Sequence, residues 1–374
     1  MDKQKNKRIK QLIGSHYECK LISSGNNFPK TNIIEDNLMD ICILLHNGFS
    51  KNELKDYFNL TEIELKKRME VLLKEELIYK KDDEEFSPTF MVISLEEGEI
   101  LFEQSEEFVD QAVMLILQNI DEIKCKTKSI SSFEPYKFED LSLFILSDVL
   151  LDAVQIDNVE KEFLKSERTK RNSMNYYYSI QEKNENSKKE AFGIYGNMSR
   201  QYGNIEYCLY GNKRYGDNFC TIDSNFIMDH FSYSEINDIL KTKEELLNEI
   251  IKVSKDEEYQ IEKKIKNGFS SLGIMNNNKI NIPILNKDDY DKLNDIANII
   301  KCEYLNIFEE GREKLYSYYQ SSSYFKEISF NEYFLWWYHF FYTRVTDVMI
   351  EKGVVLVPDT NNFHYIVALN NRED

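Results

Sequence analysis

Two pairs of cysteine and histidine near the start of the sequence have side-chain types that bind transition metals. His16 and Cys19 are separated by two residues, and Cys42 and His46 by three. Side chains four positions apart lie on one face of a helix, where they can share a zinc ion. The two pairs need not meet in space, and we expect no metal site. We expect instead a buried Cys42 and an exposed His46 at the end of a helix.

A second candidate site lies in residues 174–222, where tyrosines are interleaved with glycines. This composition is typical of strands and turns, and it predicts a small antiparallel sheet of about four strands. Arginines within it can hold a carboxylate or phosphate, and aromatic rings can form pocket walls, so a small-molecule or peptide effector could bind here. The candidate ligand-binding residues are Tyr195, Arg200, Tyr207, Arg214 and Tyr215. The favoured alternative is an ordinary sheet with half-buried tyrosines, because pockets are few per protein.

Linear motifs of known enzymes are absent from the sequence. It contains no P-loop, dinucleotide-binding, GxSxG, HExxH or kinase string. Asp229 precedes His230, but no serine or cysteine elbow accompanies them. We therefore expect no catalytic residues, no cofactor and no enzymatic activity. An enzyme in the central region is the alternative, and a deep pocket lined by Arg214, Asp217 and His230 would support it.

Capping boxes locate the helices of the N-terminal region. Ser50 is followed by Glu53, and Thr61 by Glu64, eleven residues further on. In each box the hydroxyl can accept from the backbone N–H three residues on, while the glutamate reaches back. The spacing predicts one short helix, a tight turn and a second helix. With a preceding helix that ends at a glycine, the expected helices cover residues 35–47, 51–58 and 62–76.

The apolar residues of these helices fit a shared core. In the last helix, Leu65, Met69, Leu72 and Leu73 have the i, i+4, i+7, i+8 spacing of one buried stripe. A hairpin should follow, with a strand at residues 77–79, a charged tip at 80–85 and a returning strand at 90–93. The order of three helices and a hairpin predicts a winged helix-turn-helix.

Residues 44–94, LLHNGFSKNELKDYFNLTEIELKKRMEVLLKEELIYKKDDEEFSPTFMVIS, resemble the winged helix of bacterial transcriptional regulators of the ArsR-like type. The resemblance implies a regulator that binds double-stranded operator DNA as a homodimer. It also implies that Thr61–Lys74 is the recognition helix and Lys80–Glu85 the tip of the wing. The DNA-binding residues that it implies are Thr61, Lys66, Lys67, Arg68, Lys74, Lys80 and Lys81.

Charge argues against this function. The whole chain has a formal net charge of −18, and residues 48–84 contain eight Lys and Arg against ten Asp and Glu. DNA-binding modules are usually basic. Residues 1–10, with five Lys and Arg against one Asp, are expected to form a mobile arm that compensates. The alternative is a winged helix that recognises a protein or peptide as an adaptor and binds no DNA.

The rest of the chain suggests a helix-rich α+β fold. Residues 1–95 are expected to form the winged helix-turn-helix, and 96–130 a linking or dimerisation region with one long helix over 96–125. Residues 131–374 would sense an effector or dimerise. They include a possible winged-helix-like unit at 286–374, in which Ser329 and Glu332 form a third capping box. Its aromatic helix would form core or a dimer interface, with a hairpin of strands 354–357 and 363–369 after it.

The sequence also predicts a cytoplasmic protein that does not enter membranes. No apolar stretch follows the basic N-terminus, so we expect no signal peptide. The apolar run at 141–154 is interrupted by Asp148 and Asp152, and the run at 333–342 is too short to span a bilayer. The six cysteines lack CxxC or CxC spacing, which is typical of reduced thiols.

Overall fold

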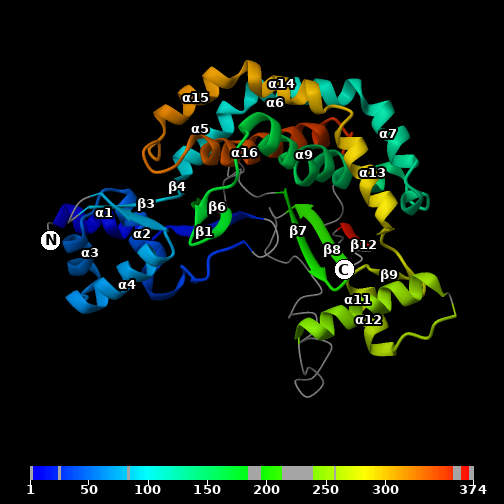
Figure 1. Cartoon of the computed structure of the whole chain (residues 1–374), viewed down its shortest axis with the longest axis horizontal. Helices are drawn as coiled ribbons and strands as arrows, with labels where there is room; N and C mark the ends of the chain where they lie inside the picture. Colours follow the sequence, from blue (N-terminus) through cyan, green and yellow to red (C-terminus); the bar gives the residue numbers. More distant parts are fainter. Residues whose placement is uncertain are drawn as a thin grey trace. The chain divides into compact units, whose positions relative to one another are not determined.

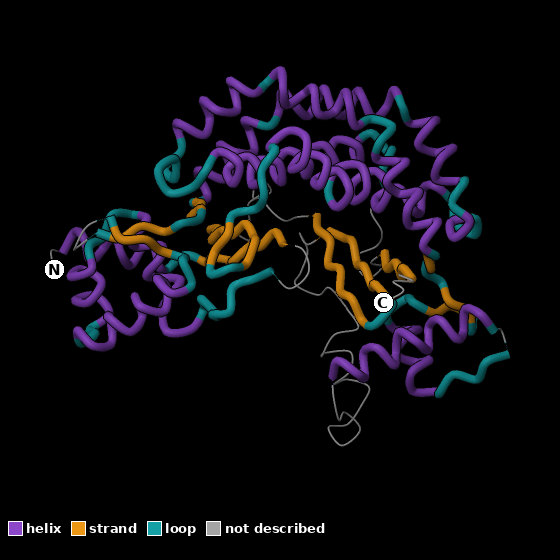
Figure 2. Tube along the Cα trace, viewed as in Figure 1, coloured by secondary structure: helices purple, strands orange, loops and turns teal. Residues whose placement is uncertain are grey.

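The computed structural model shows a helix-rich α+β fold with small sheets (Figures 1 and 2). It describes residues 3–23, 27–81, 85–183, 195–212, 239–256, 258–356 and 364–369. The chain forms two compact units, each assembled from three stretches of sequence. Unit 1 contains residues 1–108, 160–192 and 308–341, and unit 2 contains residues 109–159, 193–307 and 342–374.

Unit 1 begins with a helix and a strand, followed by three helices and a hairpin, coloured blue to cyan in Figure 1. These elements are α1 (Lys3–Ile13), β1 (His16–Ser23), α2 (Leu38–His46), α3 (Lys51–Phe58), α4 (Glu62–Lys74), β2 (Ile78–Lys80) and β3 (Phe86–Pro88). A 3-10 turn at Glu35–Asn37 precedes α2. Their apolar side chains share one core, in which Leu54, Leu65 and Leu72 are fully buried.

Both predicted capping boxes are present in this part of the chain. The Ser50 hydroxyl accepts from the backbone N–H of Glu53, whose carboxylate accepts from the N–H of Ser50. Thr61 and Glu64 form the same reciprocal pair at the start of α4. Asn59 ends α3 in the left-handed conformation, with φ 52°, which turns the chain towards α4. The local signals therefore set the ends of both helices.

The prediction of a mobile basic arm is wrong, because residues 3–13 form helix α1. Ile9 is fully buried, and α1 packs against α2. Arg8 lies over the ring of Phe49, with 5.5 Å between its guanidinium carbon and the ring centroid. Lys5 forms an ion pair with Glu53. Burial of the apolar side of this basic helix therefore holds residues 3–13 against the core, although their charge alone suggested a mobile arm.

The predicted returning strand of the hairpin is also wrong. The partner of β2 is β3, with Ile78 opposite Pro88 and Lys80 opposite Phe86. Residues 91–93 form β4 (Met91–Ile93), which pairs in parallel with β6 (Met174–Lys183). β6 also pairs antiparallel with β1, so the strand order is β1-β6-β4. The short β5 (Lys170–Arg171) pairs with the start of β6.

The single long helix predicted over 96–125 is instead broken into α5 (Leu95–Gln104), α6 (Glu106–Gln118) and α7 (Ile120–Lys128). At the breaks, the Ser105 hydroxyl donates to the carbonyl of Phe102, and the Asn119 amide donates to the carbonyl of Leu115. A side chain that donates to a backbone carbonyl competes with the N–H group that would otherwise bond to that carbonyl and continue the helix. Ser94 and Glu97 form a further capping box, which opens α5.

The remaining helices of unit 1 carry its aromatic core. These are α15 (Arg312–Ser321) and the first half of α16 (Phe330–Glu351), preceded by α14 (Lys301–Glu310). Trp336 and Trp337 are fully buried, as expected for core residues. The third capping box is half formed. The Ser329 hydroxyl accepts from the N–H of Glu332, but the Glu332 carboxylate accepts from Arg171, at 2.8 Å.

Unit 2 contains a second small sheet with helices around it. Its strand order is β11-β12-β8-β7, from β7 (Tyr195–Tyr202), β8 (Ile205–Asn212), β11 (Ile284–Leu285) and β12 (His364–Leu369). Its other elements include α8 (Phe138–Leu143), a π-helical turn (Phe144–Val149), α9 (Ala153–Asn158), α11 (Ile239–Lys255), α12 (Lys263–Ser271), a short hairpin of β9 (Met275–Asn276) and β10 (Lys279–Ile280), and α13 (Lys287–Ala297).

This second sheet corrects two expectations. Residues 174–222 do not form one sheet, because β6 pairs within unit 1 while β7 and β8 pair within unit 2. The C-terminal hairpin is wrong as well. Both edges of β12 are occupied, by β8 and β11, and residues 354–356 are not a strand. In the described part of the chain, no helix combines the length and apolarity needed to cross a bilayer.

Candidate nucleic-acid interface

Helix α4 has a buried face and an exposed face on opposite sides. Leu65, Met69 and Leu72 are buried in the core of unit 1. The opposite side, which follows from the helical spacing of 100° per residue, is exposed and consists of Ile63, Lys66, Lys67, Glu70 and Lys74. Lys66 lies 3.7 Å from Glu70, and both side chains are more than half exposed. Thr61, the N-terminal cap of the helix, is also exposed.

Arg68 is held differently from the lysines. Its Nε donates to the carbonyl of Asp36 at 2.8 Å, and its Nη1 donates to the carbonyl of Glu64 at 3.2 Å. The side chain therefore joins α4 to the turn that precedes α2. Of the residues predicted on this helix, Thr61, Lys66, Lys67 and Lys74 lie on the exposed surface, while Arg68 is half-buried.

Several acidic residues in the unfavourable charge count are bound within unit 1. Glu62 accepts from Lys55 at 2.9 Å and lies 3.1 Å from Lys51, and these lysines hold its pKa below the usual value. Hydrogen bonds from Lys5 and from the N–H of Ser50 lower the pKa of Glu53. Opposite charges this close offset one another locally. Lys51 and Lys55 are already in the count over residues 48–84, so of these partners only Lys5 adds a positive charge that the count leaves out.

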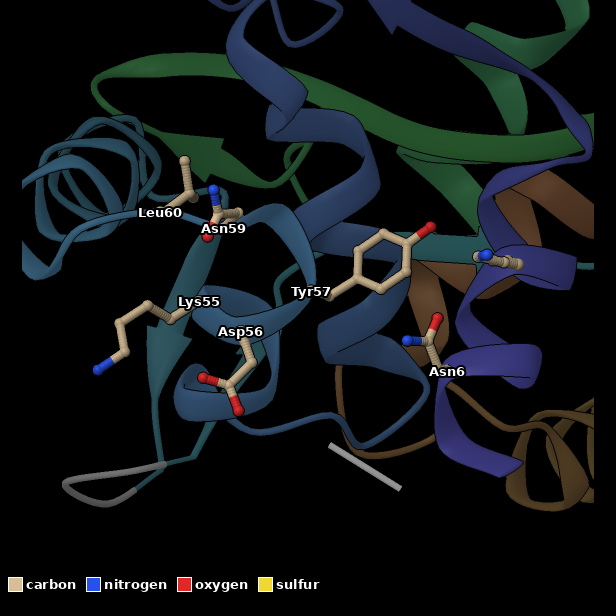
Figure 3. A pocket seen from close by; sticks show the side chains of 7 residues that line it. Asn6, Lys55, Asp56, Tyr57, Asn59 and Leu60 are labelled. Atoms are coloured by element: carbon tan, nitrogen blue, oxygen red, sulfur yellow. The ribbon is translucent and has the colours of Figure 1, made fainter. Parts of the chain in front are cut away.

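Helix α1 adds positive charge to the same part of the chain. Its sequence contains five Lys and Arg and no acidic residue. Over residues 1–88, through the end of β3, there are fifteen Lys and Arg against sixteen Asp and Glu, so α1 brings this part of the chain close to neutral. An open hollow of about 630 Å³ lies between α1 and the end of α3, and Tyr57 and Asn6 face each other across it (Figure 3). It is lined by Asn6, Lys10, Lys55, Asp56, Tyr57, Asn59 and Leu60.

The hairpin carries the last two predicted contact residues. Lys80 ends β2, and the backbone N–H of Lys81 donates to the carbonyl of Glu85 at 2.9 Å. Both lysine side chains are exposed. Residues 82–84, which belong to the predicted tip, lie outside the described residues.

The predicted ligand-binding residues are only partly described. Tyr195 and Arg200 lie on β7, where Arg200 is opposite Tyr207 in the register with β8. Tyr207 is buried. The other predicted residues, Arg214 and Tyr215, lie outside the described residues, as do Asp217 and His230 from the alternative enzyme site.

Cys42 is fully buried, as predicted, and burial raises the pKa of its thiol. The prediction of an exposed His46 is wrong. Its Nδ1 lies 2.7 Å from Oε2 of Glu327, and its Nε2 lies 3.2 Å from Oγ of Ser323. Among the described residues, no three His, Cys, Asp or Glu side chains are arranged to hold a metal ion.

Two polar contacts within unit 1 had no signal in the sequence. In the first, Glu327 accepts from the hydroxyl of Ser87 on β3 at 2.6 Å as well as contacting His46. In the second, Arg171 and Glu332 are both only 1% exposed. The partners lie more than 150 residues apart in the chain. No local spacing could predict such pairs, because long-range folding brings them together.

Comparison of the chain with models of known protein families, with curated proteins and with solved structures finds no match to any of the three.

Proposed function

We propose that the chain is a transcriptional regulator in which residues 38–88 form a winged helix-turn-helix that binds double-stranded DNA. Helix α4 would be the recognition helix and the β2–β3 hairpin the wing. The observation that carries this proposal is the exposed face of α4, where Lys66, Lys67 and Lys74 lie opposite a buried apolar stripe. Recognition helices place such a face in the major groove, while the preceding helix crosses the backbone.

The charge of the surrounding elements supports this function. Lys3, Lys7 and Lys10 are exposed on α1, which packs against α2. Lysines that neutralise phosphates release condensed counterions, and this release drives association with DNA. In the proposed complex, the lysines of α1 would add to the positive field around the module.

The proposal extends to the rest of the chain. Unit 2 would carry the sensing or dimerisation function, and a homodimer would read two half-sites separated by about one helical turn of DNA, roughly 34 Å.

A binding assay on labelled DNA from the upstream region of the protein's own gene tests the proposal. In the variant Lys66→Glu with Lys67→Glu, we expect the affinity to fall by more than about tenfold at low salt. We also expect the slope of log K against log salt to become shallower by about four, because each of the two subunits loses two phosphate contacts and each contact contributes about one.

The matched control is Lys126→Glu with Lys128→Glu, which makes the same change in charge on the exposed side of α7. It should bind DNA nearly as the unmodified chain does. Equal losses in both variants would show that only the overall charge matters, and would contradict a specific role for α4. Absence of DNA retention at low salt would contradict the proposal altogether.

A protein- or peptide-binding adaptor is the second candidate. Two exposed apolar side chains on α4 favour it, since Ile63 is 81% exposed and Leu73 is 37% exposed. Copurification of a protein partner that is lost in Ile63→Ala, together with no DNA retention, would favour the adaptor.

A further inference from the structure

Ile63 is the most exposed large apolar side chain among the described residues, at 81%. A single exposed apolar residue is ordinary on a protein surface. The position of this one is not ordinary, because it lies in the first turn of α4, on the same face as Lys66 and Lys67. The N-terminal residues of a recognition helix are the ones that reach base edges.

The polar side chains of this first turn are already occupied. The Thr61 hydroxyl donates to Glu64 at 2.6 Å and accepts from its N–H at 3.3 Å, within the capping box. The carboxylate of Glu62 is bound by Lys51 and Lys55. Of the four side chains from Thr61 to Glu64, all of them described, Ile63 alone is not engaged in hydrogen bonds or ion pairs. Ile63 is therefore the side chain of this turn that can meet a base through an apolar contact.

The major groove offers one apolar group, the C5-methyl group of thymine. The other base edges there present donors and acceptors, and covering them with an isoleucine would leave them unpaired at a cost. We propose that Ile63 contacts a thymine methyl group, so that the protein selects thymine at one position in each half-site. This inference rests on the proposed DNA-binding function.

The experiment begins with selection of duplexes from a random pool by the full-length chain. Each thymine in the selected duplex is then replaced in turn by deoxyuridine, which lacks only the methyl group. At one position per half-site, we expect the substitution to weaken binding by about fourfold, the value for one buried methyl group. The Ile63→Ala variant should bind the thymine and deoxyuridine duplexes equally well at that position.

The matched control is Ile100→Ala, which removes an exposed isoleucine from α5. It should keep the full sensitivity to deoxyuridine. The inference is overturned, with DNA binding intact, if no deoxyuridine position weakens binding or if Ile63→Ala keeps the same sensitivity as the unmodified chain. If no duplex is enriched or retained at low salt, the proposed function fails and the inference fails with it.

Discussion

Glu18 on β1 is kept ionised by two lysines that flank its carboxylate. Nζ of Lys183 lies 2.5 Å from one oxygen, and Nζ of Lys20 lies 2.6 Å from the other. Partial burial raises the pKa of Glu18, but the hydrogen bonds from these lysines outweigh it and lower the pKa from 4.5 to about 2. Because Lys183 is on β6, this contact fastens the outer strand of the sheet to its central strand.

We predict that Glu18→Gln lowers the free energy of unfolding by about 1 kcal/mol at pH 7, a value reduced for solvent screening. The folded-state pKa lies below the unfolded one, so this stability is fully present above about pH 4.5 and is lost as the pH falls towards 2. Urea unfolding at pH 7 and at pH 3 measures the difference. Glu122→Gln, on the exposed side of α7, is the control. A loss that is the same at both pH values would contradict the prediction.

Single helices are the scale at which the sequence was most informative. The boxes Ser50/Glu53 and Thr61/Glu64 predicted the starts of α3 and α4, because a cap depends on residues only three positions apart. The same rule would have found the Ser94/Glu97 box and the break before α5. The buried stripe of α4 was predictable for the same local reason, except at Leu73, which was expected in the stripe but is 37% exposed because it lies about 80° around the helix from Leu65.

Strand pairing was not predictable from the sequence. β6 pairs with β1, about 160 positions earlier, and with β4, and no local pattern names either partner. The residues beyond Pro88 were therefore assigned to the wrong strand. The candidate site was likewise predictable only where it depends on local spacing. The lysines of α4 were found from helical periodicity, while the place of α1 beside α2 depends on the burial of Ile9, which composition concealed.

At the scale of the element, we predict that Thr61→Ala destabilises unit 1 by about 1 kcal/mol, the usual cost of losing an N-terminal cap. In the alanine variant, the carboxylate of Glu64 also loses its hydrogen bond from the Thr61 hydroxyl. This negative charge lies at the start of α4, which is the part of the helix that would face DNA. We therefore expect weaker DNA binding together with a lower urea midpoint. Thr61→Ser keeps the hydroxyl and is the control. If the alanine and serine variants have the same stability, the cap makes no net contribution.

Unit 1 as a whole depends on three separate stretches of the chain. β6 supplies Tyr176, Tyr178 and Ile180 to the core that α1–α4 also fill. Arg171 donates to the carbonyl of Tyr176 at 3.0 Å and to Glu332 on α16 at 2.8 Å, so the second and third stretches meet in a buried ion pair. A buried charge that loses its partner is strongly destabilising. The sequence suggested a domain boundary at residue 95. A domain that ended there would lack β6 and the ion pair between Arg171 and Glu332.

We therefore predict that a fragment of residues 1–95 does not fold cooperatively by itself, although it contains every helix of the proposed DNA-binding module. β1 and β4 both lose their partner in this fragment, and the apolar side chains that β6 covers become exposed to water. Thermal unfolding followed by circular dichroism should be broad for the fragment and sharper for the full chain. Adding a peptide of residues 167–183 should sharpen the transition, because it restores the central strand. A fragment that unfolds sharply without the peptide, with well-dispersed amide resonances, would show that residues 1–95 form an independent domain.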